Sequence, residues 1–128
     1  MKLTNGEIFN AKEPLQKLLA EKLPVKIAFG LAKTAMKLDD PLMAINQVRQ
    51  GLFKTHGDFD NTQQKYTVKP YIDDGKGKAI RNPKAEEFEK EMEELMAQET
   101  EIVIDVVKLP DTLEIEPRIL MALEKFVK

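Results

Sequence analysis

The predicted fold is decided by the stretch PVKIAFGLAKTAMKL, which spans residues 24–38. Pro24 can open a helix, because the N–H group that it lacks has no hydrogen-bond partner in a first turn. The residues that follow are apolar on nearly every side of such a helix, a pattern typical of a helix that is buried. We therefore expect a buried helix here, covered by the elements that precede and follow it.

Further helices are predicted on both sides of this stretch. Leucines at three- and four-residue spacing predict the preceding helix, with Asn10 as its N-cap and Pro14 in its first turn. After the stretch, Asp39-Asp40-Pro41 either caps a new helix or marks a kink in one longer helix. The helical pattern as a whole covers residues 11–55.

The N-terminal residues predict a small hairpin. Asn5-Gly6 is the dipeptide that type I′ turns favour, because both residues tolerate positive φ. The flanking segments Lys2–Thr4 and Glu7–Phe9 would form its two strands.

Residues 57–82 lack the helical period and are rich in glycine and polar side chains. We expect them to form a mobile loop or hairpin segment of the same domain, the most mobile part of the chain. Within this segment, Tyr66–Val68 and Pro70–Ile72 have the composition of strands. Residues 73–77 predict the turn that leads back toward Arg81.

The C-terminal part combines helices with a strand. Asn82-Pro83 predicts the N-cap and first residue of a helix, and Pro117 begins a last one. Residues 101–109 have the strongest strand composition, because most of them are β-branched, and we expect a central strand covered on each side. The predicted fold is a single α+β domain over residues 1–128, with about five helices packed on a small, mostly antiparallel sheet.

Composition restricts the chemistry of this chain. The 128 residues contain no cysteine and one histidine, which excludes disulfides, thiolate nucleophiles, zinc fingers and iron–sulfur clusters. No uncharged run approaches the roughly 20 residues that a membrane-spanning helix needs. We therefore expect no membrane association and no cofactor.

Two segments could still bind a small ion. His56, Asp58 and Asp60 offer three ligands to a divalent cation, although a polar segment at the end of a helix explains them equally well. Residues 75–78, Gly-Lys-Gly-Lys, could surround an anion with N–H groups and ammonium groups. They lack the spacing of a phosphate-binding loop, and a hairpin tip accounts for them better.

Charge is distributed unevenly along the chain. Residues 65–84 carry a net charge of +4, whereas residues 85–117 carry −10. In the acidic segment Glu87, Glu91 and Glu94 share one helical face, which we expect to contact a basic partner protein. Nucleic acid is disfavoured as a partner, because this helix would repel phosphate from the neighbouring basic segment.

Three parts of the sequence resemble a group of small uncharacterised bacteriophage and prophage proteins. They are the opening Lys2–Glu7, the junction Leu23–Lys26 that leads into the apolar helix, and the ending from Glu87 to Val127. The resemblance implies a phage origin and the cytoplasm of the bacterial host as location. The resemblance also implies the absence of an assigned enzymatic role.

These observations predict a non-catalytic phage protein that acts through protein–protein contacts, in virion assembly or as an accessory to it. One alternative is an inhibitor of a host enzyme or defence complex that acts through the acidic face. A weaker alternative is an accessory to nucleic-acid processing. A homo-oligomer is compatible with each of these functions.

Overall fold

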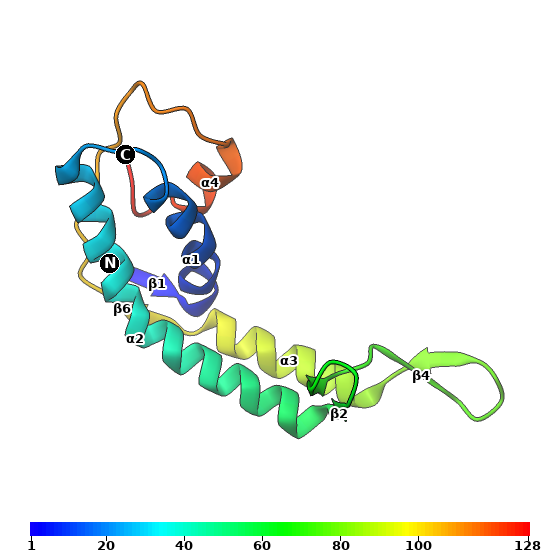
Figure 1. The fold of residues 1–128 in the computed structure, drawn as a ribbon. Coiled ribbons are helices and arrows are strands. Elements are labelled where there is room, and N and C mark those ends of the chain that lie inside the picture. Colours follow the sequence, from blue (N-terminus) through cyan, green and yellow to red (C-terminus); the bar gives the residue numbers. More distant parts are fainter. The chain divides into compact units, whose positions relative to one another are not determined.

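The computed structural model describes residues 1–128, which form four helices and six short strands (Figure 1). In chain order the elements are β1 (Lys2–Thr4), α1 (Asn5–Leu19), α2 (Val25–His56), β2 (Asp58–Asp60), β3 (Lys65–Thr67), β4 (Tyr71–Asp73), β5 (Ala79–Arg81), α3 (Pro83–Ala97), β6 (Glu99–Glu101) and α4 (Pro117–Ala122). The α+β composition is confirmed. The predictions of five helices and of one sheet are wrong, because the chain has four helices and three separate two-stranded sheets.

The chain forms two compact units. The first unit contains residues 1–43 and 98–128, and the second contains residues 44–97. Helix α2 begins in the first unit and ends in the second. None of the four helices combines the length and the apolar composition that crossing a membrane requires.

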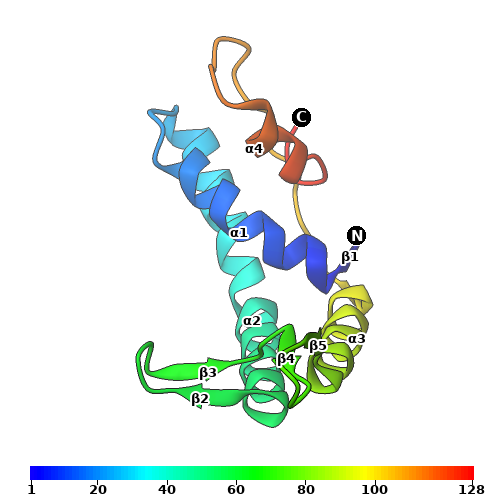
Figure 2. The same cartoon turned by 90° about the vertical axis from the view of Figure 1, so that its right-hand side faces the viewer.

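The core of the first unit lies around α1. Strand β1 pairs with β6 in antiparallel register, with Leu3 opposite Thr100 (Figure 1). Helix α4 packs against α1 (Figure 2). Apolar side chains from all parts of the unit are buried: Leu3, Ile8, Ala11, Leu15, Leu18, Leu31, Leu38, Leu42, Leu123 and Phe126. The spacing of the α1 members of this set places them on one face of that helix.

The predicted hairpin at Asn5-Gly6 is wrong, because α1 begins at Asn5. Thr4 is the N-cap, and its hydroxyl oxygen accepts a hydrogen bond of 3.1 Å from the N–H of Glu7. The Glu7 carboxylate accepts in return from the N–H of Thr4 at 3.1 Å. This reciprocal capping box provides hydrogen-bond acceptors for the N–H groups of Thr4 and Glu7, and so stabilises the helix start. Since the helix begins early, Pro14 lies inside it and not in its first turn.

Helix α2 runs without interruption past Asp39-Asp40-Pro41, so the second of the two predicted alternatives, one longer helix, is the observed one. The expectation that this helix is buried on all sides is wrong. Leu31, Leu38 and Leu42 are buried, whereas Phe29 and Met36 are exposed.

The predicted central strand at residues 101–109 is also wrong. Strand pairing stops at Glu101, and the following residues pair only at Val107, which forms a parallel bridge with Val127. The N–H of Val107 donates to the Phe126 carbonyl at 3.0 Å. Only part of this segment is buried, since Ile102 and Leu109 point inward while Val103 is exposed.

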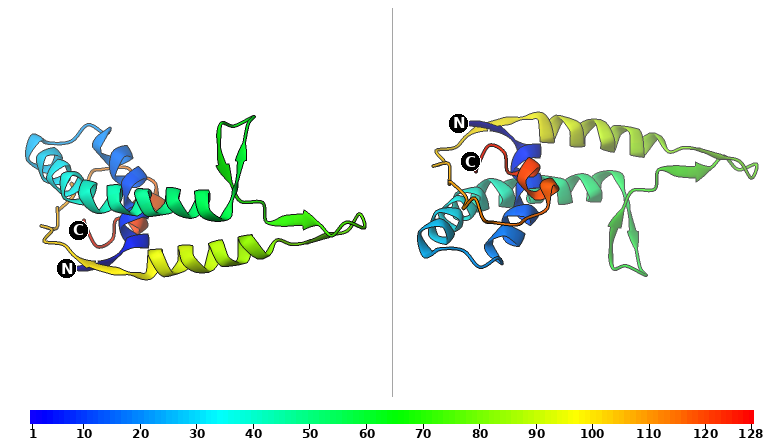
Figure 3. Two further views of the ribbon diagram at one scale, coloured as in Figure 1. Left: turned by 90° about the horizontal axis from the view of Figure 1, so that it is seen from below. Right: turned by 90° about the horizontal axis from the view of Figure 1, so that it is seen from above.

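The second unit contains α3, the end of α2 and two hairpins (Figure 3). Strand β2 pairs with β3, and β4 pairs with β5, both antiparallel. The predicted turn at residues 73–77 and the predicted helix start at Asn82-Pro83 are confirmed. The predicted helix start at Pro117, in the first unit, is confirmed as well.

Removal of the capping box should measurably lower the stability of the protein. Thr4→Ala removes the hydroxyl that accepts from Glu7, and we expect the free energy of unfolding to fall by about 1 kcal/mol. Thr112→Ala, at an exposed position in the same unit, serves as the control and should change it by less than about 0.5 kcal/mol. Urea denaturation of both variants measures the difference. Equal losses in the two variants would contradict the cap.

Glu7 is also held by the C-terminal part of the unit. The Lys125 Nζ atom lies 2.6 Å from Glu7 Oε2, and this hydrogen bond, with that from the Thr4 N–H, lowers the pKa of the Glu7 carboxyl. Because the pKa is lower in the folded state, the stabilisation is complete above the unfolded-state pKa and is lost as the pH falls through the folded-state value.

Lys125→Ala should therefore raise the pKa of Glu7 toward its ordinary value of 4.5. Titration of the side-chain carboxyl carbon by NMR reports the change directly. The acid limb of a stability–pH profile should become shallower in the variant. An unchanged Glu7 titration would show that Lys125 has no part in holding this carboxylate.

Candidate partner-binding site

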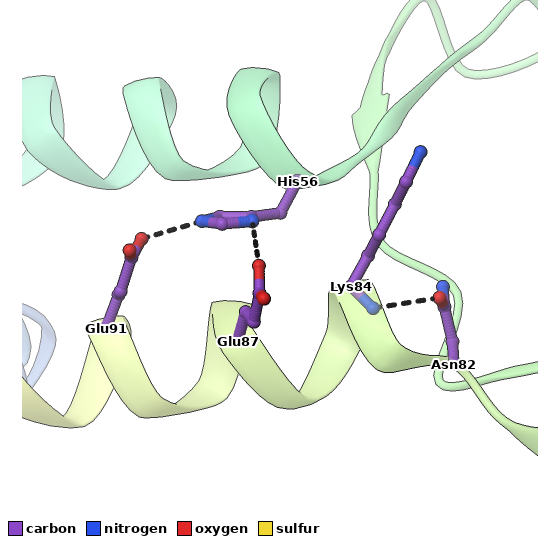
Figure 4. Close-up of polar contacts among 5 residues, drawn as sticks. All are labelled: His56, Asn82, Lys84, Glu87 and Glu91. Atoms are coloured by element: carbon purple, nitrogen blue, oxygen red, sulfur yellow. Dashed lines mark hydrogen bonds and ion pairs between the residues drawn. The ribbon is translucent and has the colours of Figure 1, made fainter.

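The end of α2 and helix α3 form the frame of the second unit. The rings of Phe53 on α2 and Phe88 on α3 lie with centroids 4.8 Å apart and planes inclined by 51°. Asn82 fixes the start of α3, because its Oδ1 accepts the N–H of Lys84 at 3.1 Å (Figure 4). The Asn82 Nδ2 group donates to the Lys69 carbonyl at 2.8 Å, which joins the helix start to the preceding loop.

His56 lies buried between these two helices. Its Nε2 atom is 2.6 Å from Oε2 of Glu91, and its Nδ1 atom is 3.9 Å from Oε2 of Glu87 (Figure 4). A carboxylate can only accept hydrogen bonds, so the Nε2–H group is the donor to Glu91. The four-residue spacing of the two glutamates places both on the α3 face that meets α2.

The structure therefore brings together two of the three glutamates that we expected on a partner-binding face. Glu87 and Glu91 turn toward His56, although both keep solvent exposure, while Glu94 is exposed. The sequence pattern did not reveal the contacts of these two glutamates with His56, because His56 precedes Glu87 by 31 positions and Glu91 by 35. The two ion pairs of His56 are with Glu87 and Glu91, so we expect a substitution of Glu94 to leave His56 in place.

The three residues considered as metal ligands are not assembled into one group. His56 points to α3, and the Asp60 carboxylate accepts from the N–H groups of Thr62 at 2.9 Å and Gln63 at 3.2 Å. The chain contains no group of three or more His, Asp or Glu side chains placed to hold a metal ion. Asp60 instead shapes the turn between β2 and β3.

The Gly-Lys-Gly-Lys segment forms the tip of the β4–β5 hairpin. Asp73 accepts from the N–H groups of Gly75 at 2.8 Å and Gly77 at 3.2 Å. Asp74 accepts from the N–H groups of Lys76 at 2.7 Å and Lys78 at 3.2 Å. These carboxylates occupy the N–H groups that an anion would need, which supports the hairpin-tip interpretation over a phosphate site.

An open recess lies between the last turns of α2 and the β2–β3 hairpin. Its volume is about 590 Å³, within the range of small-ligand and peptide-side-chain sites. It is lined by three aromatic rings, Phe53, Phe59 and Tyr66, by three cations, Arg49, Lys54 and Lys65, and by Gln50, Gln64 and Thr67. No carboxylate is among the lining residues, so the recess favours an anionic group beside an apolar one.

The hairpin holds two of these rings in place. Phe59 and Tyr66 are directly paired across β2 and β3, with ring centroids 5.3 Å apart in an edge-to-face arrangement. On α2, the Arg49 guanidinium lies 5.8 Å from the centroid of Phe53. Sequence analysis missed this site, because its residues come from a helix end and two short strands. The alternation of Asp58-Phe59-Asp60 after a helix-ending glycine was the available signal.

Comparison with protein-family models, with curated proteins and with solved structures finds no match for this chain. The recess and the acidic face are therefore interpreted from their own geometry.

Gly57 allows the hairpin to approach the end of α2. A Cβ atom at this position would lie 2.5 Å from the Thr67 carbonyl oxygen and 2.6 Å from that of Phe53, closer than real contacts permit. Gly57→Ala should therefore lower the free energy of unfolding by about 1–3 kcal/mol and displace the hairpin that lines the recess.

Gly51→Ala is the matched control, because a Cβ atom there meets nothing within 4 Å and the residue lies inside α2. It should stabilise the protein by about 0.5–1 kcal/mol. Urea denaturation gives both values, and the amide resonances of residues 58–67 report the hairpin. A Gly57→Ala variant with unchanged hairpin resonances would show that the close approach is not required.

Proposed function

We propose that this chain is a non-catalytic bacteriophage protein that binds another protein, in virion assembly or as an accessory to it. The observation that supports the proposal best is the recess beside the β2–β3 hairpin. Exposed aromatic rings beside an arginine have the composition that protein interfaces favour, and a bound partner would cover the exposed rings of Phe59 and Tyr66.

The second unit presents two surfaces of opposite charge. The recess contributes the cations, whereas α3 contributes the acidic face with Glu94 and the exposed parts of Glu87 and Glu91. A partner segment that is acidic and carries an apolar side chain would suit the recess, and a basic segment would suit α3. Opposed charges of this kind fix the orientation of a partner and accelerate its association.

Inhibition of a host enzyme or defence complex remains the alternative that relies on the acidic face alone. Single-stranded nucleic acid is a further candidate, because bases stack on aromatic rings while cations contact the phosphates. The recess has both components. The variants described next distinguish virion assembly, host inhibition and nucleic-acid binding.

The test is affinity capture of the full-length tagged protein from infected cells. Lys54→Glu combined with Lys65→Glu reverses the charge of the recess, and we expect it to abolish recovery of the captured partner. Lys76→Glu combined with Lys78→Glu makes the same charge change at the exposed β4–β5 tip and should leave recovery intact. Since rim charges act through screened attraction, recovery by the unmodified protein should decrease as salt rises.

Two further arms identify the class of partner. Glu94→Lys should weaken the capture of a partner that uses the acidic face, and Glu114→Lys in the first unit is its control. Fluorescence anisotropy with a labelled single-stranded oligonucleotide tests the nucleic-acid candidate. A virion protein lost only with the recess variant supports the proposal. Equal recovery with both lysine variants, or tight oligonucleotide binding that the recess variant abolishes, would contradict it.

A further inference from the structure

Four large apolar side chains on α2, all in the first unit, are exposed to solvent. The exposed fractions are 85% for Val25, 64% for Phe29, 72% for Met36 and 69% for Met43. At 3.6 residues per turn these side chains lie within about 40° of one another around the helix axis. We call this set the α2 stripe.

The α2 stripe occupies the face where an ordinary surface helix carries polar residues. Leu31, Leu38 and Leu42 are buried and lie on the opposite face of α2. The stripe extends over roughly 27 Å of helix. Between Met36 and Met43 the exposed Asp39 and Asp40 lie on its two flanks. A row of large apolar side chains at the surface marks an interaction site. Unbranched methionine side chains, which adapt to irregular partners, are suited to such a site.

Three of the four members of the stripe are spaced symmetrically about Met36. Phe29 and Met43 each lie seven residues from it, on opposite sides along the helix. On one flank of the stripe, Lys33 precedes Met36 by three residues and Asp40 follows it by four. An antiparallel pair with its two-fold axis at Met36 would keep this flank on the same side of both helices, and would place Lys33 of one copy within about one residue of Asp40 of the other along the helix.

We propose that the α2 stripe binds a second copy of this chain, with the two α2 helices antiparallel and Met36 at the two-fold axis. Phe29 then packs against the partner's Met43, and Met36 packs against its own counterpart. Lys33 lies beside the partner's Asp40, and the same ion pair forms a second time by symmetry. The interface is therefore apolar along its centre with complementary charges on one flank.

The charges favour the antiparallel arrangement over a parallel one. In a parallel pair of helices the two copies of this flank would lie on opposite sides of the interface, so that neither Lys33 would meet an Asp40. Lys33 is already held beside the stripe, because its Nζ atom lies 5.5 Å from the centroid of the Phe29 ring. The proposal is independent of the recess and of the partner that binds there.

The first test is the mass of the purified full-length protein in sedimentation equilibrium over a concentration series. We expect the mass to rise with concentration from 14.6 kDa to twice that value. Met36→Lys should raise the dissociation constant of the dimer at least about thirtyfold, as expected for a residue at the centre of an interface. Met121→Lys is the matched control, because Met121 is 73% exposed in the same unit but lies on α4.

The second test exchanges the charges. Lys33→Asp alone and Asp40→Lys alone each place like charges opposite each other twice, and each should raise the dissociation constant by about tenfold. The double variant Lys33→Asp/Asp40→Lys should restore the original value. Circular dichroism at a concentration where the protein is monomeric checks that none of these exposed substitutions alters the fold.

The third test determines the direction of the helices by oxidation, since the chain has no cysteine of its own. Met36→Cys should form a disulfide-linked dimer with itself. Phe29→Cys should not, because two copies of this position would be roughly 21 Å apart, well beyond the reach of a disulfide. A mixture of the Phe29→Cys and Met43→Cys proteins should cross-link.

Each alternative has its own result. Self-cross-linking of Phe29→Cys would replace the antiparallel pair by a parallel one and overturn the proposal. A mass of 14.6 kDa at every concentration, or equal effects of Met36→Lys and Met121→Lys, would show that a second copy does not bind the stripe. Failure of the double charge exchange to restore association would exclude the Lys33–Asp40 register.

Discussion

The constraint on which this structure depends is that α2 serves two cores with one continuous helix. Its 32 residues make it roughly 48 Å long, and at each turn only one side of a helix can face a core. Leu31 and Leu38 are buried in the first unit, whereas His56 and Phe53 meet α3 in the second. The remaining faces of α2 are left to solvent, the hairpin or a partner.

Local sequence signals predicted the ends of several elements correctly. Asn82-Pro83 and Pro117 begin helices, and residues 73–77 turn between two strands, because each signal acts through hydrogen bonds within a few residues. At the N-terminus two local signals competed. Asn5-Gly6 favours a turn, whereas Thr4 and Glu7 favour a capping box, and the helix that follows decided the outcome in favour of the cap.

Signals that depend on distant partners were less reliable. The β-branched residues after Glu101 suit a pleated, half-buried surface, but they form no strand, because Ile102 makes one backbone hydrogen bond to Met1 and Val107 makes only an isolated bridge. Composition likewise indicated that residues 24–38 are buried on all sides. The number of faces that are covered depends on which elements pack against the helix, and the sequence of the helix does not contain that information.

The candidate site was predictable in part. Spacing placed Glu87, Glu91 and Glu94 on one face of α3; Glu94 lies exposed there, whereas the other two turn toward His56, and partner binding by this face stays a prediction. The role of Glu91 beside His56 was missed, because the contact joins residues 35 positions apart. The aromatic recess was missed for the same reason. Phe53 comes from a helix, while Phe59 and Tyr66 meet it only once the hairpin has formed.

The continuity of α2 also has a consequence for the order of folding. The unfavourable step in forming a helix is its first turn, after which each added residue requires little further ordering for one more hydrogen bond. Once residues 25–43 are helical on the first unit, residues 44–56 can extend that helix without a new nucleation step. Pro41 weakens this propagation, because it lacks the N–H that would bond to the carbonyl of Lys37. Whichever part of α2 forms first, its extension into the other unit crosses a junction that lacks one hydrogen bond.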